Sequence, residues 1–195
     1  MKLKTRDMIL VALFAALTAI GAYLKIPTQP VPITLQILFC MYAGILLGSK
    51  LGFISQIIYV LMGLIGLPVF AGGASGFGYI FRPSFGYLIG FILCGYIAGK
   101  ISEKIYEVKG LKGFMYIFIA AVSGLAVVYL VGVPYLYMIF NVYQGKAIDF
   151  GTALKWGLYP FIVQDLVKCF IVALTSVKVL PALRRAGYIA RPDKK

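Results

Sequence analysis

An acidic and a basic residue, Asp165 and Lys168, lie inside an apolar run of membrane length at 159–179. Either charge costs about 2.5–3.5 kcal/mol near the middle of a membrane helix, so both are expected to face a bundle interior or a polar cavity rather than lipid. The two residues are three positions apart, which places them on one helix face. Pro160 precedes them and is expected to bend the helix and free a carbonyl near Trp156. We interpret this stretch as one wall of a binding pocket.

A second interpretation is that Asp165 and Lys168 form an ion pair whose only role is to hold helices together. In that case, replacing both residues by isosteric apolar ones would leave the protein folded and its ligand binding unchanged. A pocket wall would instead lose its ligand and keep its fold.

The composition is that of an integral membrane protein. Of 195 residues, 62% are hydrophobic and 13% are charged, and the mean hydropathy is +0.95. These values, with only short polar stretches between the apolar runs, exclude a soluble domain. We expect one membrane-embedded substrate-binding domain, residues 1–195, in the lipid bilayer of the cell membrane.

Six apolar runs predict an all-α bundle of six transmembrane helices. The runs lie at 8–24, 33–47, 51–66, 85–101, 114–140 and 159–179. Gly132 and Pro134 are expected to interrupt the fifth run, because proline removes a helical N–H. Glycines in the fourth run recur at GxxxG spacing, which favours close contact between helices.

The net charge of +13 does not indicate a nucleic-acid-binding protein, because the basic residues cluster at the ends of the apolar runs. Six spans put both termini on one side of the membrane. Placing that side in the cytoplasm gives it fourteen Lys and Arg residues, against four outside, which predicts an orientation with both termini inside. Asp165 then lies roughly 20 Å from the inner boundary at Lys178, in the outer half of the bilayer.

The residue types exclude most enzymatic chemistry. Histidine is absent, which removes Ser-His and Cys-His catalytic arrangements and histidine-ligated metal sites. Cys40, Cys94 and Cys169 lie far apart inside apolar runs and are interpreted as small buried hydrophobic residues. Asp165 is the only acidic residue within a span, so the clustered carboxylates of a metal-dependent lipid transferase are missing. We expect no catalytic residue, metal or cofactor.

Two irregular segments are expected to meet Asp165 on the external side. Pro27, Pro30 and Pro32 predict a stiff, extended connector that crosses the pocket mouth. At 66–84, glycines are interleaved with aromatic residues. This pattern suits a segment that wraps a small ligand with main-chain N–H groups and aromatic rings.

Several stretches together resemble one family, the biotin-specific substrate-capture subunits (S-components, BioY group) of energy-coupling factor transporters. They are the first run with Ala12 and Ala16, VPITLQ at 31–36, GLPVFAGG at 66–73, PSFGYLIGF at 83–91, and Asp165 followed by Lys168. The resemblance covers nearly the whole chain, and the combination is specific although each motif alone is weak. One departure is Arg-Pro-Ser at 82–84, where the family often has a small residue and Pro-Thr.

The resemblance implies a subunit that binds biotin with high affinity and captures it from the external side. The Asp165 carboxylate can accept from both ureido N–H groups, and Lys168 can donate to the ureido oxygen or reach the carboxylate tail. The other residues expected to contact biotin are Gln36, Gly73, Ser75, Tyr79, Arg82 and Tyr87. Two of these roles stay open: Arg82 is a partner for the tail or a rim charge, and Gln36 is a ligand or a bond between helices.

The chain has no nucleotide-binding motif, so ATP-driven uptake requires other subunits. The resemblance implies a transmembrane coupling protein and two ATP-binding subunits as partners, with Ala12 and Ala16 as the docking face. The alternative is a proton- or ion-coupled secondary carrier in which Asp165 titrates. Such a carrier favours an inverted repeat, and the two halves of the chain show no convincing similarity.

Overall fold

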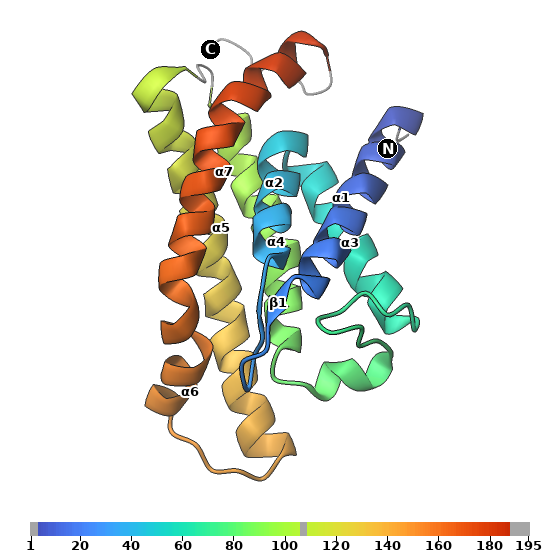
Figure 1. Ribbon diagram of the computed structural model, residues 1–195, viewed down its shortest axis with the longest axis vertical. Helices are drawn as coiled ribbons and strands as arrows, with labels where there is room; N and C mark the ends of the chain where they lie inside the picture. Colours follow the sequence, from blue (N-terminus) through green and yellow to red (C-terminus); the bar gives the residue numbers. More distant parts are fainter. Residues whose placement is uncertain (1–3, 106–108, 188–195) are drawn as a thin grey trace.

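The computed structural model of the protein (Figure 1) describes residues 4–105 and 109–187. Four basic residues that contribute to the predicted orientation lie outside the described residues: Lys2, Arg191, Lys194 and Lys195.

Helices make up most of the described chain, in agreement with the predicted all-α class. The α-helices there are α1 (Thr5–Tyr23), α2 (Gln36–Leu47), α3 (Ser49–Leu64), α4 (Phe85–Glu103), α5 (Gly110–Met138), α6 (Phe150–Gly157) and α7 (Tyr159–Arg185). Shorter elements are the 3₁₀ helix η1 (Phe77–Phe81), the π helix η2 (Ile139–Tyr143) and the strands β1 (Lys25–Ile26) and β2 (Ile33–Thr34).

Four helical segments are long and apolar enough to cross a membrane: α1, α4, α5 continued by η2, and α7. The apolar helices α2 and α3 are shorter, with 12 and 16 residues. At 1.5 Å per residue α2 extends about 18 Å, against a hydrocarbon core of about 30 Å. The protein is therefore an integral membrane helix bundle with four candidate spans, and two of the predicted spans correspond to short helices.

The predicted interruption of the fifth run at Gly132 and Pro134 is wrong. α5 continues through both residues to Met138, and its helical geometry changes only afterwards, in the π helix η2. Gly132 serves close packing, because a Cβ there would lie 2.6 Å from Cδ1 of Tyr87 on α4. Proline is tolerated inside membrane helices when neighbouring structure compensates.

Glycines allow α2, α3 and α4 to pack backbone against backbone. A Cβ on Gly44 would lie 2.6 Å from the carbonyl oxygen of Gly95, and one on Gly99 would lie 2.6 Å from the Cα of Ser49. Larger residues would force these helices apart. The close contact predicted for the glycines of the fourth run is confirmed.

The start of α1 and the end of α7 lie at one end of the molecule, whereas η1, α6 and the β1–β2 ribbon lie toward the opposite end (Figure 1). Lys25 pairs with Thr34 and Ile26 with Ile33 in this antiparallel ribbon. The proline-rich connector at 27–32 therefore forms its tip. Segments that are far apart in sequence therefore gather at this end (Figure 1).

Hydrogen bonds that involve charged side chains connect α3, α4 and α7 at the end of the molecule that holds the start of α1. The backbone N–H of Ser49 donates to Oε1 of Glu103 at 2.7 Å, so a residue of α4 caps the start of α3. Arg184 on α7 donates to the carbonyl oxygens of Ile105 at 2.7 Å and Ser102 at 3.1 Å. These bonds satisfy carbonyl groups where α4 ends.

Candidate binding site

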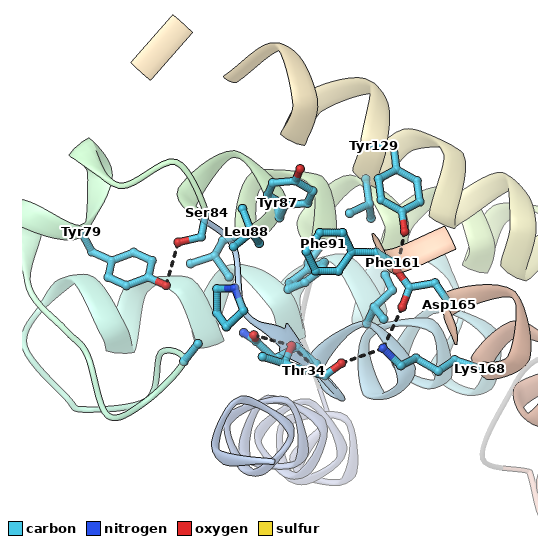
Figure 2. A pocket seen from close by; sticks show the side chains of 16 residues that line it. Thr34, Tyr79, Ser84, Tyr87, Leu88, Phe91, Tyr129, Phe161, Asp165 and Lys168 are labelled. Atoms are coloured by element: carbon cyan, nitrogen blue, oxygen red, sulfur yellow. Dashed lines mark hydrogen bonds and ion pairs between the residues drawn. The ribbon is translucent and has the colours of Figure 1, made fainter. Parts of the chain in front are cut away.

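A cavity lies between the proline-rich connector, α2, α4, α5 and α7, and 16 residues line it (Figure 2). Its volume is about 50 Å³, below the roughly 300–1,000 Å³ of most small-molecule sites. The cavity is therefore narrow in this structure. A ligand of more than a few atoms enters only if lining side chains move apart.

The predicted charged pair closes one end of the cavity (Figure 2). Nζ of Lys168 lies 2.7 Å from Oδ1 of Asp165, and 9% of each side chain is exposed. Lys168 also donates to the backbone carbonyl of Thr34 at 2.7 Å. Tyr129 on α5 donates its hydroxyl proton to Oδ2 of Asp165 at 2.6 Å. The connector strand β2, α5 and α7 therefore meet at this pair.

The charged pair keeps hydrogen-bonding capacity for a ligand. A carboxylate offers about four lone-pair sites and an ammonium three donors. Within the described residues, the Asp165 side chain accepts one bond on each oxygen, from Lys168 and Tyr129. The Lys168 ammonium donates two, to Asp165 and Thr34. The pair therefore offers an acceptor next to a donor, which complements a ligand edge that carries a donor beside an acceptor.

Hydroxyl groups occupy the opposite end of the cavity (Figure 2). Oγ of Ser84 donates to the Tyr79 hydroxyl at 3.0 Å. The exposed guanidinium of Arg82 lies 5.2 Å from the centre of the Tyr79 ring. Leu88 and Phe91 lie between the two ends (Figure 2). The cavity is thus charged at one end, apolar in the middle and rich in hydroxyl groups at the other end.

Five of the predicted ligand-binding residues line this cavity: Gln36, Tyr79, Tyr87, Asp165 and Lys168. Gln36 also joins elements, because its Nε2 donates to the hydroxyl of Tyr59 on α3 at 2.6 Å. Both roles considered for Gln36 are therefore compatible with its position.

Pro160 does not bend a helix as expected. α6 ends at Gly157, and Pro160 stands in the first turn of α7, where its missing N–H is not needed. The carbonyl of Gly157 accepts a hydrogen bond from the Tyr87 hydroxyl at 2.7 Å. This hydrogen bond links the end of α6 to Tyr87, which lines the cavity.

Three predicted residues, Gly73, Ser75 and Arg82, do not line the cavity. Gly72 and Gly73 form a tight turn with φ of 78° and 75°, a backbone conformation that favours glycine. Ser75 and Arg82 are exposed. Their contact with a ligand stays a prediction, although Ala71, Tyr79 and Ser84 of the same segment, 66–84, do line the cavity.

The sequence did not single out Thr34, Ser84 or Tyr129, which also line the cavity. Thr34 and Ser84 lie within the motif stretches 31–36 and 83–91, which are a usable signal. Tyr129 is one of 14 tyrosines, and no spacing in the sequence connects it with the charged pair.

The small residues of α1 form two rows that point in different directions. Ala15 and Ala19 are buried against the rest of the chain. Ala12 and Ala16 are exposed. The inward row is explained by packing within this chain, and the outward row leaves a smooth strip that another helix can approach closely.

The arrangement is suited to binding a small polar molecule. Within 4–105 and 109–187, no three His, Cys, Asp or Glu side chains gather as metal ligands would. The charged groups that face the cavity are one carboxylate and one ammonium, and these form a pair with each other.

Comparison with known proteins identifies the relatives of this chain. The model of the BioY family matches residues 1–185. The probable biotin transporter BioY of Lysinibacillus sphaericus is 40% identical over 185 residues, which cover 95% of this chain and 92% of that protein. The probable biotin transporter BioY of Pyrococcus horikoshii is 39% identical over 177 residues, which cover 91% of this chain and 98% of that protein.

A solved structure shares the fold. It is the crystal structure of the S-component for biotin from an ECF-type ABC transporter, with a TM-score of 0.79 and 28% sequence identity, and the match covers 91% of this chain and 94% of that chain. Together with the family match over residues 1–185, these similarities establish that the chain belongs to the BioY family.

Proposed function

We propose that this protein is the biotin-binding membrane subunit of an energy-coupling factor transporter and that it captures biotin from outside the cell. The observation that carries the proposal is the buried pair of Asp165 and Lys168 at one end of a cavity, in a chain of the BioY family. Its relatives are named as biotin transporters, and the similar solved structure is a biotin S-component.

The charged end of the cavity suits the ureido ring of biotin. In this five-membered ring the two N–H groups point to opposite sides of the carbonyl, so each side presents a donor beside an acceptor. Asp165 accepts from one N–H, and the third proton of Lys168 is donated to the carbonyl oxygen. In this arrangement the Asp165 carboxylate accepts from one ureido N–H, whereas from the sequence we expected it to accept from both.

The remainder of the cavity suits the rest of the ligand. The thioether ring and the aliphatic chain of biotin pack against Leu88 and Phe91. The carboxylate tail points toward the hydroxyl groups of Ser84 and Tyr79, with Arg82 as the partner charge. The 5.2 Å between the Arg82 guanidinium and the Tyr79 ring supports this direction.

In this proposal the chain is a single membrane-embedded domain over residues 1–195 that crosses the cell membrane six times, with α2 and α3 as short spans and both termini in the cytoplasm. The excess of Lys and Arg on the side assigned to the cytoplasm supports the orientation. The start of α1 and the end of α7 lie at the same end of the molecule (Figure 1), as an even number of crossings requires.

The proposed partners are a transmembrane coupling subunit and two ATP-binding subunits. The exposed alanines Ala12 and Ala16 on α1 provide the docking strip for the coupling subunit. Biotin is the transported ligand in this assembly, and the energy for uptake comes from the partner subunits.

Titration of the purified protein with biotin in detergent tests the site. Replacing Asp165 by Asn removes a charged hydrogen-bond partner, worth about 1.5–3 kcal/mol, and is expected to weaken binding at least tenfold. The same change leaves the Lys168 ammonium buried and unpaired, which costs about 3–5 kcal/mol of stability. The double variant Asp165→Asn, Lys168→Met removes both charges, so it is expected to unfold near the wild-type temperature yet bind no biotin.

A second pair at the same helical spacing provides the control. Lys100 and Glu103 on α4 lie 3.9 Å apart and are partly exposed, and Lys100→Met with Glu103→Gln should leave biotin binding unchanged. If the Asp165, Lys168 double variant bound biotin like wild type, the pair would only brace helices and the proposed site would be wrong.

A further inference from the structure

A groove lies at the end of the molecule that holds α6 and the tip of the β1–β2 ribbon (Figure 1). Its volume is about 510 Å³, which is in the range of small-molecule sites. Its described lining comes from the proline-rich connector, the turn before α4, η2 with the loop after it, and α6: Gln29, Pro30, Pro83, Phe140, Gln144, Lys146 and Trp156. None of these residues lines the proposed biotin cavity, so the groove is a separate candidate site.

The groove and the biotin cavity lie along the same two segments. In the connector, Pro30 lines the groove and the next residue, Val31, lines the cavity. In the turn before α4, Pro83 lines the groove and Ser84 lines the cavity. The proposed function places the carboxylate tail of biotin at Ser84. A longer tail would therefore continue between the connector and this turn into the groove.

Hydrogen bonds hold the loop that carries the basic side chain of the groove. The backbone N–H of Lys146 donates to the carbonyl of Phe140 at 2.9 Å. The side-chain amide of Asn141 donates to the carbonyl of Ile148 at 3.2 Å and accepts from the N–H of Ile148 at 3.1 Å. Lys146 therefore starts from a fixed backbone position, which lowers the cost of ordering this loop when a ligand binds.

The side chains of the groove suit an amide, an aliphatic stem and a carboxylate. Gln29 and Gln144 carry amides, which donate and accept hydrogen bonds as a peptide group does. Trp156 is 40% exposed, and its ring packs 5.5 Å from the ring of Phe140, so it offers an apolar face to a stem. Lys146 is the one charged residue in the described lining, and its exposed ammonium lies 6.0 Å from the centre of the Phe140 ring.

We propose that the groove is a subsite for biotin whose carboxylate is amide-linked to an amino acid, so that the subunit also captures biotinyl-amino acids. The subsite depends on the proposed function, because it extends the biotin cavity. The linking amide replaces the tail carboxylate at Ser84, the stem crosses the groove over Trp156, and the terminal carboxylate pairs with Lys146. Biotin itself has a shorter tail, which ends at Ser84.

Titration of the purified full chain with two synthetic amides of biotin tests the subsite. The amide of aminohexanoic acid ends in a carboxylate, whereas the amide of hexylamine has the same number of stem carbons without one. Neither amide keeps the tail carboxylate of biotin, so the loss of its pairing with Arg82 cancels in the comparison. Wild type is expected to bind the acid roughly fivefold more tightly than the hexylamide, as an exposed ion pair allows.

Lys146→Gln should abolish this preference for the acid. Its affinity for biotin should match that of wild type, because Lys146 does not line the biotin cavity, and this match verifies that the variant folds. The matched control is Lys155→Gln, which removes an exposed lysine of α6 outside the groove lining. The control variant should keep the preference of wild type.

Trp156 provides a second measurement, because it is the single tryptophan and lines the groove. The stem of the aminohexanoic acid amide should exclude water from the indole ring and shift its emission to shorter wavelengths. Biotin should leave the emission unchanged. An equal shift with biotin would indicate movement of the connector rather than occupancy of the groove and would overturn the subsite.

The subsite would also be overturned, with the proposed function intact, if wild type bound biotin but did not distinguish the two amides. Equal loss of the preference in Lys146→Gln and Lys155→Gln would overturn it as a general effect of charge. Weaker binding of biotin to Lys146→Gln would do the same, since Lys146 would then serve the tail of biotin itself. If wild type bound neither biotin nor either amide, the proposed function would be wrong, and the subsite with it.

Discussion

Asp165 is a buried carboxylate within the candidate membrane span α7, and neighbours from two helices hold it in place. Lys168 on the same helix contacts Oδ1, and Tyr129 on α5 contacts Oδ2. Opposite charge and a hydrogen bond together offset the cost of burying this group. The two contacts also fix the direction in which its remaining lone pairs point.

Tyr129→Phe tests whether this fixed direction matters. The change removes one hydrogen bond to a charged group and leaves the ion pair, so biotin binding should weaken roughly tenfold as Asp165 gains freedom to rotate. Titration of the purified subunit measures the change. Tyr137→Phe, on the same helix but outside the cavity lining, is the control and should bind like wild type. Equal biotin affinity of Tyr129→Phe and wild type would refute a role for Tyr129 in orienting the carboxylate.

At the level of residues, the sequence predicts the parts of the site that are costly to place in a membrane. Asp165 and Lys168 are conspicuous because a buried charge requires a partner or a function. Tyr129 contacts the same carboxylate but is not conspicuous, since a hydroxyl on an aromatic ring is common in spans. Ser75 and Arg82 are predicted from their chemistry alone, and both are exposed, although the same segment, 66–84, contributes Ala71, Tyr79 and Ser84 to the cavity wall.

The short helix α6 connects the surface with the cavity wall. Asp149 caps its first turn by accepting from the hydroxyl and the backbone N–H of Thr152, at 2.6 and 3.0 Å. These bonds hold the pKa of Asp149 below its usual range. At the other end of α6, the Gly157 carbonyl accepts from Tyr87, which lines the cavity.

The lowered pKa sets the pH range in which the cap is effective. Its stabilisation is fully present above the unfolded-state pKa of about 4 and is lost as pH falls through the folded-state pKa. Trp156 on α6 is the single tryptophan and packs 5.5 Å from the Phe140 ring, so its fluorescence reports on this helix. Asp149→Ala should shift the emission toward that of a solvated tryptophan at neutral pH, a shift that wild type shows only in acid.

Asp149→Asn is the matched control, because an amide caps a helix without titrating in this range. It should keep the neutral-pH emission of wild type and abolish the acid-induced shift. If Asp149→Ala and wild type had the same spectrum at neutral pH, the cap would not stabilise α6.

At the level of elements, the long apolar runs of the sequence predict the positions of the helices correctly. The prolines are a poorer guide to where a helix ends. The runs at 8–24, 85–101 and 159–179 correspond to helices long enough to span a membrane. Pro134 was expected to break α5 and does not. Its neighbour Gly132 brings α5 against Tyr87, and this tertiary contact could not be read from the order of residues.

For the whole molecule, the exposed alanines Ala12 and Ala16 lie apart from the cavity. We therefore expect docking of the coupling subunit and binding of biotin to be separable by mutation. Ala12→Leu with Ala16→Leu fills the exposed strip, so it should abolish biotin uptake by cells that contain the partner subunits. Biotin binding by the purified subunit should stay within about twofold of wild type, because neither residue lines the cavity. Uptake of labelled biotin and titration of the purified protein measure the two effects.

Ala126→Leu on α5, also exposed, adds the same bulk to another helix and should leave uptake and binding unchanged. Parallel loss of uptake and binding in the Ala12, Ala16 variant would contradict docking at this strip. Similar loss of uptake in the Ala126 variant would point to a general effect of bulk at the lipid-facing surface.

The small volume of the cavity, about 50 Å³, leads us to expect that ligand capture is gated by movement of its walls. Widening must precede or accompany entry, so the observed association rate should level off at high vitamin concentration, at the rate at which the walls separate. The same barrier slows escape, since a bound molecule leaves only when the walls part again. If biotin binds in this cavity, we expect slow dissociation from the isolated subunit and faster release once the proposed coupling subunit is bound.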